Sequence, residues 1–494
     1  MIGILFYAPK GEKNMFSNND IKQINEHGLS VANVEQQIAD FISGFPFANI
    51  TRPATIGDGI LQFDTVATNY FINLYDNEKQ NYQITKFVPA SGAATRMFKD
   101  MFDFLSTNNT NDTVNTVVQN INRFAFYDEL KKFLPTTPTT HDIVNAMLCP
   151  DKLNLGALPK ALIAFHKYEN DVRTAAHEHL IEGAQYAESN GIVNIHFTLS
   201  PEHIDKFNKL MEHIIPATEQ KFNVKFNITT SIQNPSTDTI AVNFDNTPFR
   251  DDNGKLVFRP AGHGALIENL NEIDSDIIFI KNIDNITNDT ARTDTIRYKK
   301  LLGGVLINLQ RRIFQYMHDL DSGTYNETEL RKFIEQELNE PLQKSQISQD
   351  EFMTILNRPL RICGVVKNTG APGGGPFWVK NHAKFDTLQI TESSQIAPES
   401  RDIMNKSTHF NPVDLVCGVR DWHGKKFNLN HFIDPKTGFI AEKSLNGRPL
   451  RAMEKPGLWN GAMAHWHTVF IEVPNTTFTP VKKVSDLLDP AHAG

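Results

Sequence analysis

Cysteine is scarce in this sequence, with three residues among 494. Cys149, Cys363 and Cys417 lie far apart and form no CxxC pair, which argues against a disulfide scaffold and against a zinc module. No apolar run reaches the length of a membrane span, and the apolar part of residues 1–10 is too short for a signal peptide. These absences together favour a cytoplasmic protein.

An excess of positive charge is also missing, because the net charge is −8 and the pI is near 6.1. Such a balance gives no overall attraction to nucleic acid or to an anionic membrane, so neither is an expected partner. Hydrophobic residues make up 40% and charged residues 21%, as in globular proteins with a substantial core. The length allows one large domain with additions, or two to three ordinary ones. The sequence contains no repeat, and it gives no indication of the oligomeric state.

What the sequence does contain is a regular alternation of apolar strands and helical stretches. The segment DIIFIKNI (276–283) is apolar almost throughout, which is typical of a strand buried on both faces. This alternation predicts an α/β sandwich around a mostly parallel central sheet. The predicted strands are ITKFVPA (84–90), VNIHFTL (193–199), FNITTSI (226–232) and DIIFIKNI (276–283).

Two segments interrupt this alternation and read as helical insertions, at about 106–150 and at 290–356. Leucines and other apolar residues recur at helical spacing from Leu301 to Met317 in the second of them. We therefore divide the chain into an N-terminal helical region at 1–80, the first half of a core at 81–289 and its second half at 357–494.

The first predicted strand ends in a turn of small residues, Ala90 to Arg96. Backbone N–H groups of such a turn, and of the helix that follows, can point at phosphate groups, and Arg96 can add a bidentate contact. The turn matches neither a Walker loop nor a GxGxxG motif. A plain strand–helix connection with a surface arginine is equally compatible with it.

A set of further motifs follows in order over about 84–488. The set resembles the UTP–sugar-1-phosphate uridylyltransferases, which are the UDP-sugar pyrophosphorylases, and we expect the link to run through a bacterial family of unknown function. The resemblance implies a glycosyltransferase-A-like nucleotidyltransferase fold. The motifs are SGAATRM (91–97), LPKALIAF (158–165), IQNPS (232–236), RPAGHGALIENL (259–270), IFIKNIDN (278–285), HFNPVDLVCGV (409–419) and FTPVKKVSDLL (478–488).

The reaction implied by this resemblance is Mg²⁺-dependent. A nucleoside triphosphate, with UTP favoured, and a sugar 1-phosphate form a nucleotide-sugar, with a UDP-sugar favoured, and pyrophosphate. The resemblance assigns catalytic roles to Arg96, Lys160 and Lys482, and Mg²⁺ ligation to Asp284. It assigns the sugar to Asn285 and Asn411. The nucleotide would be bound by Ala90, Ser91, Gly92, Ala93, Thr95, Gln233, Gly262, His263 and Gly264.

The chain also departs from the family pattern, which leaves alternatives open. The first turn has less glycine than the relatives carry, and Ala265 stands where the UDP-glucose enzymes have an acid. A catalytically inactive nucleotide- or sugar-phosphate-binding protein is the main alternative. A glycosyltransferase would need a DxD-type motif, whose first acid is missing from NIDN (282–285). His465 and His467 alternate on one strand, where a half-buried edge pair is favoured over a metal site.

Overall fold

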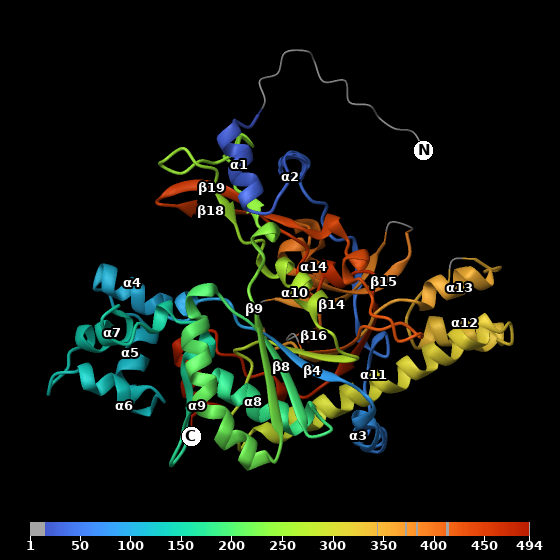
Figure 1. Ribbon diagram of the computed structural model, residues 1–494, viewed down its shortest axis with the longest axis horizontal. Coiled ribbons are helices and arrows are strands. Elements are labelled where there is room, and N and C mark those ends of the chain that lie inside the picture. Colours follow the sequence, from blue (N-terminus) through green and yellow to red (C-terminus); the bar gives the residue numbers. More distant parts are fainter. Residues whose placement is uncertain (1–14, 343, 371–372, 382–383, 412–413, 494) are drawn as a thin grey trace.

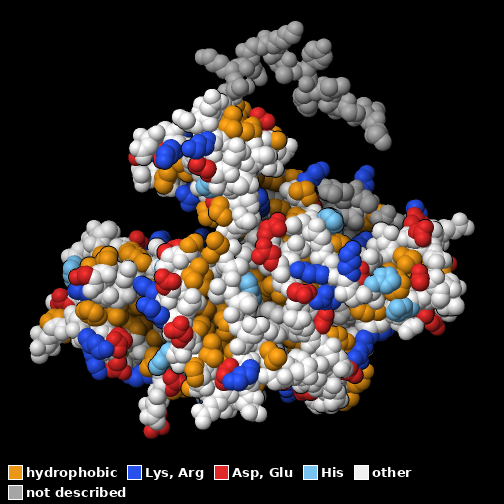
Figure 2. Space-filling model, in the orientation of Figure 1, with side chains coloured by type: hydrophobic (Ala, Val, Ile, Leu, Met, Phe, Trp, Pro, Cys, Tyr) orange, Lys and Arg blue, Asp and Glu red, His pale blue; other side chains and the backbone are white. Residues whose placement is uncertain are grey.

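The computed structural model describes residues 15–342, 344–370, 373–381, 384–411 and 414–493. The segment at 1–10, on which the expected absence of a signal peptide rests, falls outside these residues. Among the helices that the structure describes, none is both long enough and apolar enough to cross a membrane. On the face seen in Figure 2, basic and acidic side chains are interspersed.

An eleven-stranded sheet runs through the centre of the molecule (Figure 1). β17 is antiparallel to both of its neighbours, and β7 and β16 are antiparallel to β8 and β13, whereas the other strands form two parallel groups on either side of β17. This mixed, mostly parallel sheet with helical insertions confirms the predicted fold class. In spatial order the strands are β2 (Thr55–Ile56), β3 (Gly59–Leu61), β20 (His467–Glu472), β13 (Leu360–Lys367), β17 (Asp414–Gly418), β12 (Ile277–Lys281), β4 (Ile84–Pro89), β8 (Ile192–Thr198) and β7 (Glu188–Ser189), with β9 (Lys225–Ser231) paired to β8 and β16 (His409–Phe410) paired to β13.

All four strands predicted from the apolar pattern are present, as β4, β8, β9 and β12. β12 is buried at every position, as its composition indicated. It pairs in parallel with β4, from Ile277 opposite Ile84 to Ile280 opposite Phe87, so the carboxyl ends of the two strands share one edge of the sheet. In open α/β sheets this edge is where ligands bind.

Helices cover both faces of the sheet. On one face the buried side chains of β4, β8, β12 and β13 pack against α3 (Thr65–Glu78), α8 (Ala175–Tyr186), α9 (Ile204–Phe222) and α11 (Arg292–Asp321). The helix predicted from the spacing of Leu301 to Met317 is therefore confirmed as part of α11. The opposite face is covered by α10 (Leu266–Glu272) and by irregular segments around Trp459 and Trp466.

Outlying elements surround this core (Figure 1). One lobe, at the left of the figure, holds α4 (Lys99–Thr107), α5 (Asp112–Gln119), α6 (Tyr127–Leu130) and α7 (Thr140–Leu148); another, at the right, holds α12 (Glu327–Gln336) and α13 (Gln349–Leu356). The upper lobe packs α1 (Asn18–Glu26) and α2 (Val31–Ser43) against β10 (Thr239–Ile240), β11 (Phe258–Arg259), β18 (Phe439–Leu445) and β19 (Arg448–Glu454). The remaining elements are β1 (Ile50–Pro53) with β14 (Gly374–Lys380) and β15 (Asp386–Glu392), β5 (Ala164–Lys167) with β6 (Val172–Thr174), and α14 (Arg401–Asn405).

The N-terminal region differs from the helical region expected at 1–80. α1, α2 and α3 lie there, but residues 50–61 form β1, β2 and β3. These short strands find their partners far along the chain, on β14 and β20. Ile60, which is 1% exposed, is buried in the core by that pairing. Strand formation here depends on tertiary partners and leaves little trace in the local pattern.

Candidate functional site

Asp284 lies just beyond the carboxyl end of β12, between two lysines. The ammonium nitrogens of Lys160 and Lys482 are 2.7 Å and 3.2 Å from its Oδ2. The side chains of Asp284 and Lys160 are 9% and 15% exposed, whereas that of Lys482 is 60% exposed. The three residues come from three distant motifs, and the structure brings them to one point.

The turn after β4 is fixed by its neighbours on both sides. Ala90 N donates to the carbonyl oxygen of Thr198 at the end of β8 (3.1 Å), and Ser200 Oγ donates to the carbonyl oxygen of Ser91 (2.8 Å). Gly92, however, faces outward, since a Cβ placed on it would meet no atom within 4 Å. The backbone of the turn is therefore held in place while remaining open to a ligand.

The chain returns from the 106–150 insertion directly beside this turn. Ala93 forms an isolated β-bridge with Pro159, and Ala94 N donates to the carbonyl oxygen of Leu158 (2.9 Å). Lys160 is thereby set next to the turn that carries Arg96, despite the long insertion between them. Thr95 and Arg96 are exposed, and Thr95 Oγ1 donates to the carbonyl oxygen of Gly156 (3.3 Å).

The segment that carries Lys482 is bound on two sides. Val481 N donates to the backbone oxygen of Asp284 (3.0 Å), and Val484 N donates to the carbonyl oxygen of Met97 (3.0 Å). Lys160 Nζ also donates to the carbonyl oxygen of Val481 (2.6 Å). Residues 481–484 thus join the Asp284 loop to Met97, which directly follows the turn at 90–96.

The charged side chains around Asp284 shift the pKa values of their neighbours. Burial alone would raise the pKa of Asp284, but the charges of Lys160 and Lys482 outweigh it and hold this pKa below its ordinary value. His263 is exposed at the surface, yet the protein atoms packed around its ring, followed by the charges of Arg96 and Lys482, lower its pKa to about 4. His263 is therefore neutral at pH 7. Two lysines thus contact the Asp284 carboxylate and a third cation, Arg96, acts on the neighbouring His263, so cationic side chains outnumber the carboxylate, which suits a polyphosphate.

The Gly262–Gly264 turn is shaped by close packing against the end of β19. Gly262 has a φ of +68°, and a Cβ on it would lie 2.8 Å from Glu454 Oε2. A Cβ on Gly264 would lie 2.7 Å from Lys455 Cβ and 2.8 Å from the Lys455 carbonyl oxygen. Both glycines are explained by this contact, whatever ligand the turn binds.

Gln233 lies beside the helix that follows this glycine turn. Asn269 of α10 donates from Nδ2 to Ser231 Oγ (2.8 Å) and to the carbonyl oxygen of Ile232 (2.9 Å). These bonds hold the end of β9 against α10. Gln233 itself is half-buried, and its assignment to the nucleotide stays a prediction.

The two residues expected to bind the sugar are buried. Asn285 is 1% exposed and accepts a hydrogen bond from Thr479 N at its Oδ1 (2.9 Å). Asn411 is 3% exposed and donates from Nδ2 to the carbonyl oxygen of Gly364 in β13 (3.1 Å). Asn285 thus helps to hold the segment that carries Lys482, whereas the described contacts of Asn411 tie it to the backbone of β13 and β14. Their assignment to the sugar stays a prediction.

Two neighbours of the site were not found from the sequence. Trp459 packs against His263 with ring centroids 4.5 Å apart, and His179 of α8 contacts the carbonyl oxygen of Ile283 through Nε2 (3.2 Å). The apolar and helical patterns around them signal only core. Nothing in those patterns indicates the contact with the Asp284 loop.

Within the described ranges no group of three or more His, Cys, Asp or Glu side chains is arranged to hold a metal ion. The expected edge position of the histidine pair is wrong, because β20 lies between β3 and β13 and His467 is fully buried. β20 was expected to be an edge strand, but β3 pairs with the side that would then have been open. A metal at the site would therefore depend on Asp284 and on oxygens supplied by the substrates.

The profile of a family described as a domain of unknown function, DUF4301, matches residues 17–493. The chain belongs to this family. No curated protein matches the DUF4301 chain. Family membership therefore brings no activity with it, and it agrees with the expected link to a family of unknown function.

Several solved structures are similar to this DUF4301 protein. A UDP-glucose pyrophosphorylase mutant of Leishmania major in complex with UDP-glucose is 13% identical over 95% of this chain and 77% of its own, with a TM-score of 0.44. The UDP-N-acetylglucosamine pyrophosphorylase of Trypanosoma brucei is 9% identical over 97% and 85%, with a TM-score of 0.47. The inositol-1-phosphate CTP transferase of T. maritima is 8% identical over 81% and 90%, with a TM-score of 0.32. With TM-scores below 0.5, these matches carry no evidence on the reaction.

Proposed function

We propose that this DUF4301 protein transfers a nucleotidyl group from a nucleoside triphosphate, UTP being favoured, to a sugar 1-phosphate and releases pyrophosphate. One observation carries the proposal. Lys160 and Lys482 contact Asp284 at the carboxyl edge of β4 and β12, beside a turn whose backbone is open and whose Arg96 lowers the pKa of His263.

This arrangement supplies what the reaction needs. A phosphate oxygen of the acceptor attacks the α-phosphorus in line, and pyrophosphate departs from the opposite side. Both reactants are anions, so positioning and neutralisation of charge account for most of the catalysis, and no enzyme nucleophile is required. In our proposal Arg96 and the turn at 90–95 hold the departing phosphates, while Lys160 and Lys482 contact the α-phosphate and the acceptor phosphate.

Mg²⁺ fits the site only as an ion shared with substrate. Asp284 is a single carboxylate whose Oδ2 already contacts two ammonium groups. Mg²⁺ commonly takes one or two carboxylates and completes its shell with phosphate oxygens and water. We propose that Asp284 holds Mg²⁺ once phosphates engage the lysines, and that the ion supplies charge neutralisation at the transferred group.

The base is assigned to the border formed by Gln233 and by the turn at 262–264. Glycine backbone and a neutral His263 beside Trp459 offer hydrogen bonds and a ring face to a planar base.

Three free cysteines, two of them buried, suit the reducing cytoplasm that we propose as the location.

The test is an assay of pyrophosphate release with Mg²⁺, each of the four nucleoside triphosphates and a panel of sugar 1-phosphates. Release that requires one triphosphate and one sugar phosphate together would establish the reaction and identify both substrates. Binding of a triphosphate without release across the panel would overturn it in favour of the inactive binding protein. Asp284→Asn is the matched variant, because it keeps the side-chain shape and removes the charge.

A further inference from the structure

Residues 489–493, which we call the C-terminal segment, pack against the loop that follows Asp284. Asn288 N and Thr287 Oγ1 both donate to the carbonyl oxygen of Ala491, at 2.9 Å and 3.0 Å. Asn288 Nδ2 donates to the carbonyl oxygen of Pro490 (3.0 Å). The loop and the segment are therefore joined by several bonds.

His492 of this segment extends the connection in two directions. It is 2% exposed, its Nε2 lies 3.0 Å from the carbonyl oxygen of Thr479, and its Nδ1 lies 2.9 Å from His166 Nε2. His166 Nδ1 in turn lies 2.8 Å from Glu178 Oε1, at the start of α8. A line of side chains thus runs from Glu178 on α8 through His166 and His492 to Thr479. Lys482 lies three residues after Thr479 in the same segment.

The direction of the hydrogen bonds along this line follows from what each group can do. A carbonyl oxygen only accepts, so His492 donates to Thr479 from Nε2. Burial and the neighbouring His166 lower the pKa of His492 to about 4, so its ring is neutral and Nδ1 accepts from His166. His166 therefore donates from Nε2 to His492, while its Nδ1 lies 2.8 Å from Glu178 Oε1. Glu178 also accepts a hydrogen bond from Tyr168 Oη and contacts the Arg292 guanidinium.

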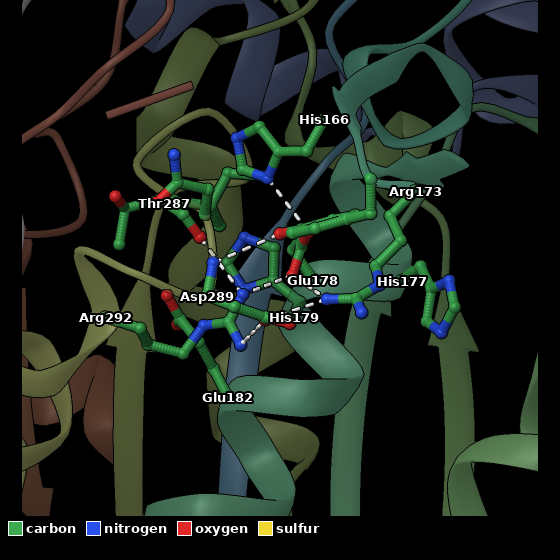
Figure 3. Close-up of polar contacts among 12 residues, drawn as sticks. His166, Arg173, His177, Glu178, His179, Glu182, Thr287, Asp289 and Arg292 are labelled. Atoms are coloured by element: carbon green, nitrogen blue, oxygen red, sulfur yellow. Dashed lines mark hydrogen bonds and ion pairs between the residues drawn. The ribbon is translucent and has the colours of Figure 1, made fainter. Parts of the chain in front are cut away.

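The Glu178 carboxylate is contacted from two sides. Figure 3 shows its carboxylate between His166 on one side and Arg292 and Arg173 on the other. Glu178 and His166 are both fully buried. The ion pair of Glu178 with Arg292 is also buried, and it is costly to break because either partner alone would be an uncompensated buried charge. This end of the line is therefore a firm anchor.

We propose that His492 is a positioning residue, which transmits the anchor at Glu178 and His166 to Thr479 and so fixes Lys482 and Asp284 relative to each other. Val481 N, two residues beyond Thr479, donates to the backbone of Asp284, and Thr479 N donates to Asn285. Release of His492 frees both the 479–484 segment and the 284–288 loop. The positioning rests on these contacts alone, and only its effect on turnover depends on the proposed function.

The test is amide hydrogen exchange, measured by mass spectrometry on the full chain. His492→Ala should speed exchange about tenfold or more at Val481 and Asn288, and leave β8 unchanged. His492→Gln places an amide N–H near the position of Nε2 and should restore protection at Val481. His492→Asn imitates Nδ1 only, so protection at Val481 should stay low.

His177→Ala is the control, since His177 neighbours Glu178 in sequence but points away from it and contacts Thr218 on α9 (3.2 Å). Unchanged exchange at Val481 and Asn288 in His492→Ala would overturn the proposal, as would an equal acceleration in His177→Ala. Binding of inorganic pyrophosphate, measured by calorimetry, should weaken in His492→Ala and recover in His492→Gln. A wild-type protein that binds no pyrophosphate would contradict the proposed function, whereas the exchange result would still decide the role of His492.

Discussion

The ammonium group of Lys160 lies 2.7 Å from the Asp284 carboxylate, although 124 positions separate the two residues. The same nitrogen bonds to the carbonyl oxygen of Val481 (2.6 Å), in the segment that carries Lys482. Lys160 thus holds two parts of the site together, whereas Lys482 touches Asp284 from the solvent side. Five predictions follow from this and related features.

The two lysines should behave differently when they are replaced. Lys160→Met should lower the free energy of unfolding by about 2 kcal/mol, because two buried acceptors lose their donor. Lys482→Met should leave stability within about 0.5 kcal/mol of wild type and weaken pyrophosphate binding about tenfold. Urea unfolding and calorimetry measure the two effects, with Lys209→Met, exposed on α9, as the control. Equal loss of stability in both variants would contradict this division of roles.

Asp284→Asn should tighten pyrophosphate binding in the absence of Mg²⁺ and abolish Mg²⁺-dependent turnover. The net charge of the site rises by one unit when the carboxylate is lost. Because the folded-state pKa of Asp284 is lowered, its charge stabilises the fold above about pH 4, and this contribution is lost as the pH falls through that pKa. The difference in melting temperature between wild type and variant should therefore shrink below about pH 4. Persistent turnover in Asp284→Asn would rule out the metal role.

His263→Gln should leave the shape of the pH–activity profile unchanged between about pH 5.5 and 8. The pKa of His263 is lowered to about 4, so its ring stays neutral over this range and takes no part in proton transfer. The measurement is the ratio of the variant rate to the wild-type rate at each pH, in which titration of the substrates cancels. An inflection of this ratio near the ordinary histidine pKa would show that His263 acts as an acid or base.

Gly92→Ala and Gly264→Ala form a matched pair. A Cβ on Gly92 meets no atom within 4 Å, so this variant should fold as well as wild type and bind pyrophosphate more weakly if phosphates approach the turn. A Cβ on Gly264 would clash with backbone oxygens of Lys455 and Pro456, both at 2.8 Å, and should destabilise by about 1–3 kcal/mol. Thermal unfolding and calorimetry on both proteins decide. Unchanged pyrophosphate binding in Gly92→Ala would remove the turn from the proposed site.

Glu182→Gln should be strongly destabilising, by about 3–5 kcal/mol. Glu182 on α8 pairs with Lys86 of β4 (3.0 Å) and Lys281 of β12 (2.9 Å), and all three side chains are at most 1% exposed. Replacement by an amide leaves two buried ammonium groups without a counter-ion. Simultaneous replacement of all three residues by Met should recover most of the loss in urea unfolding. A triple variant no more stable than Glu182→Gln would contradict this account.

The sequence indicates that Asp284 and the turn at 90–96 lie at one edge of the sheet. Asp284 ends an apolar strand, and the turn at 90–96 ends the strand beside it in space, so their shared edge follows from parallel pairing. The position of Lys482 came from its motif, since no strand pattern leads to it. The contact between His492 and His166 could not be predicted from the sequence, because the two residues lie in distant segments that show no strand or helix periodicity.

Long-range pairing also explains the remaining differences in the fold. β1, β2 and β3 are too short to show an alternation, and they become strands only through β14 and β20. β20 in turn lies inside the sheet because β3 covers it, which is why His467 is buried. Local periodicity describes which face of an element is apolar, but it carries little information on which distant segment will lie beside it.

The bridge between Ala93 and Pro159 means that the 106–150 excursion leaves and re-enters the core at almost the same place. The cost of closing such an excursion grows only with the logarithm of its length. Its polar stretches can therefore lengthen or shorten without moving Arg96 away from Lys160. A sequence-pattern search that fixes the number of residues between Arg96 and Lys160 would miss relatives with a longer or shorter insertion. A structural search that uses the backbone around the Ala93–Pro159 bridge would find them.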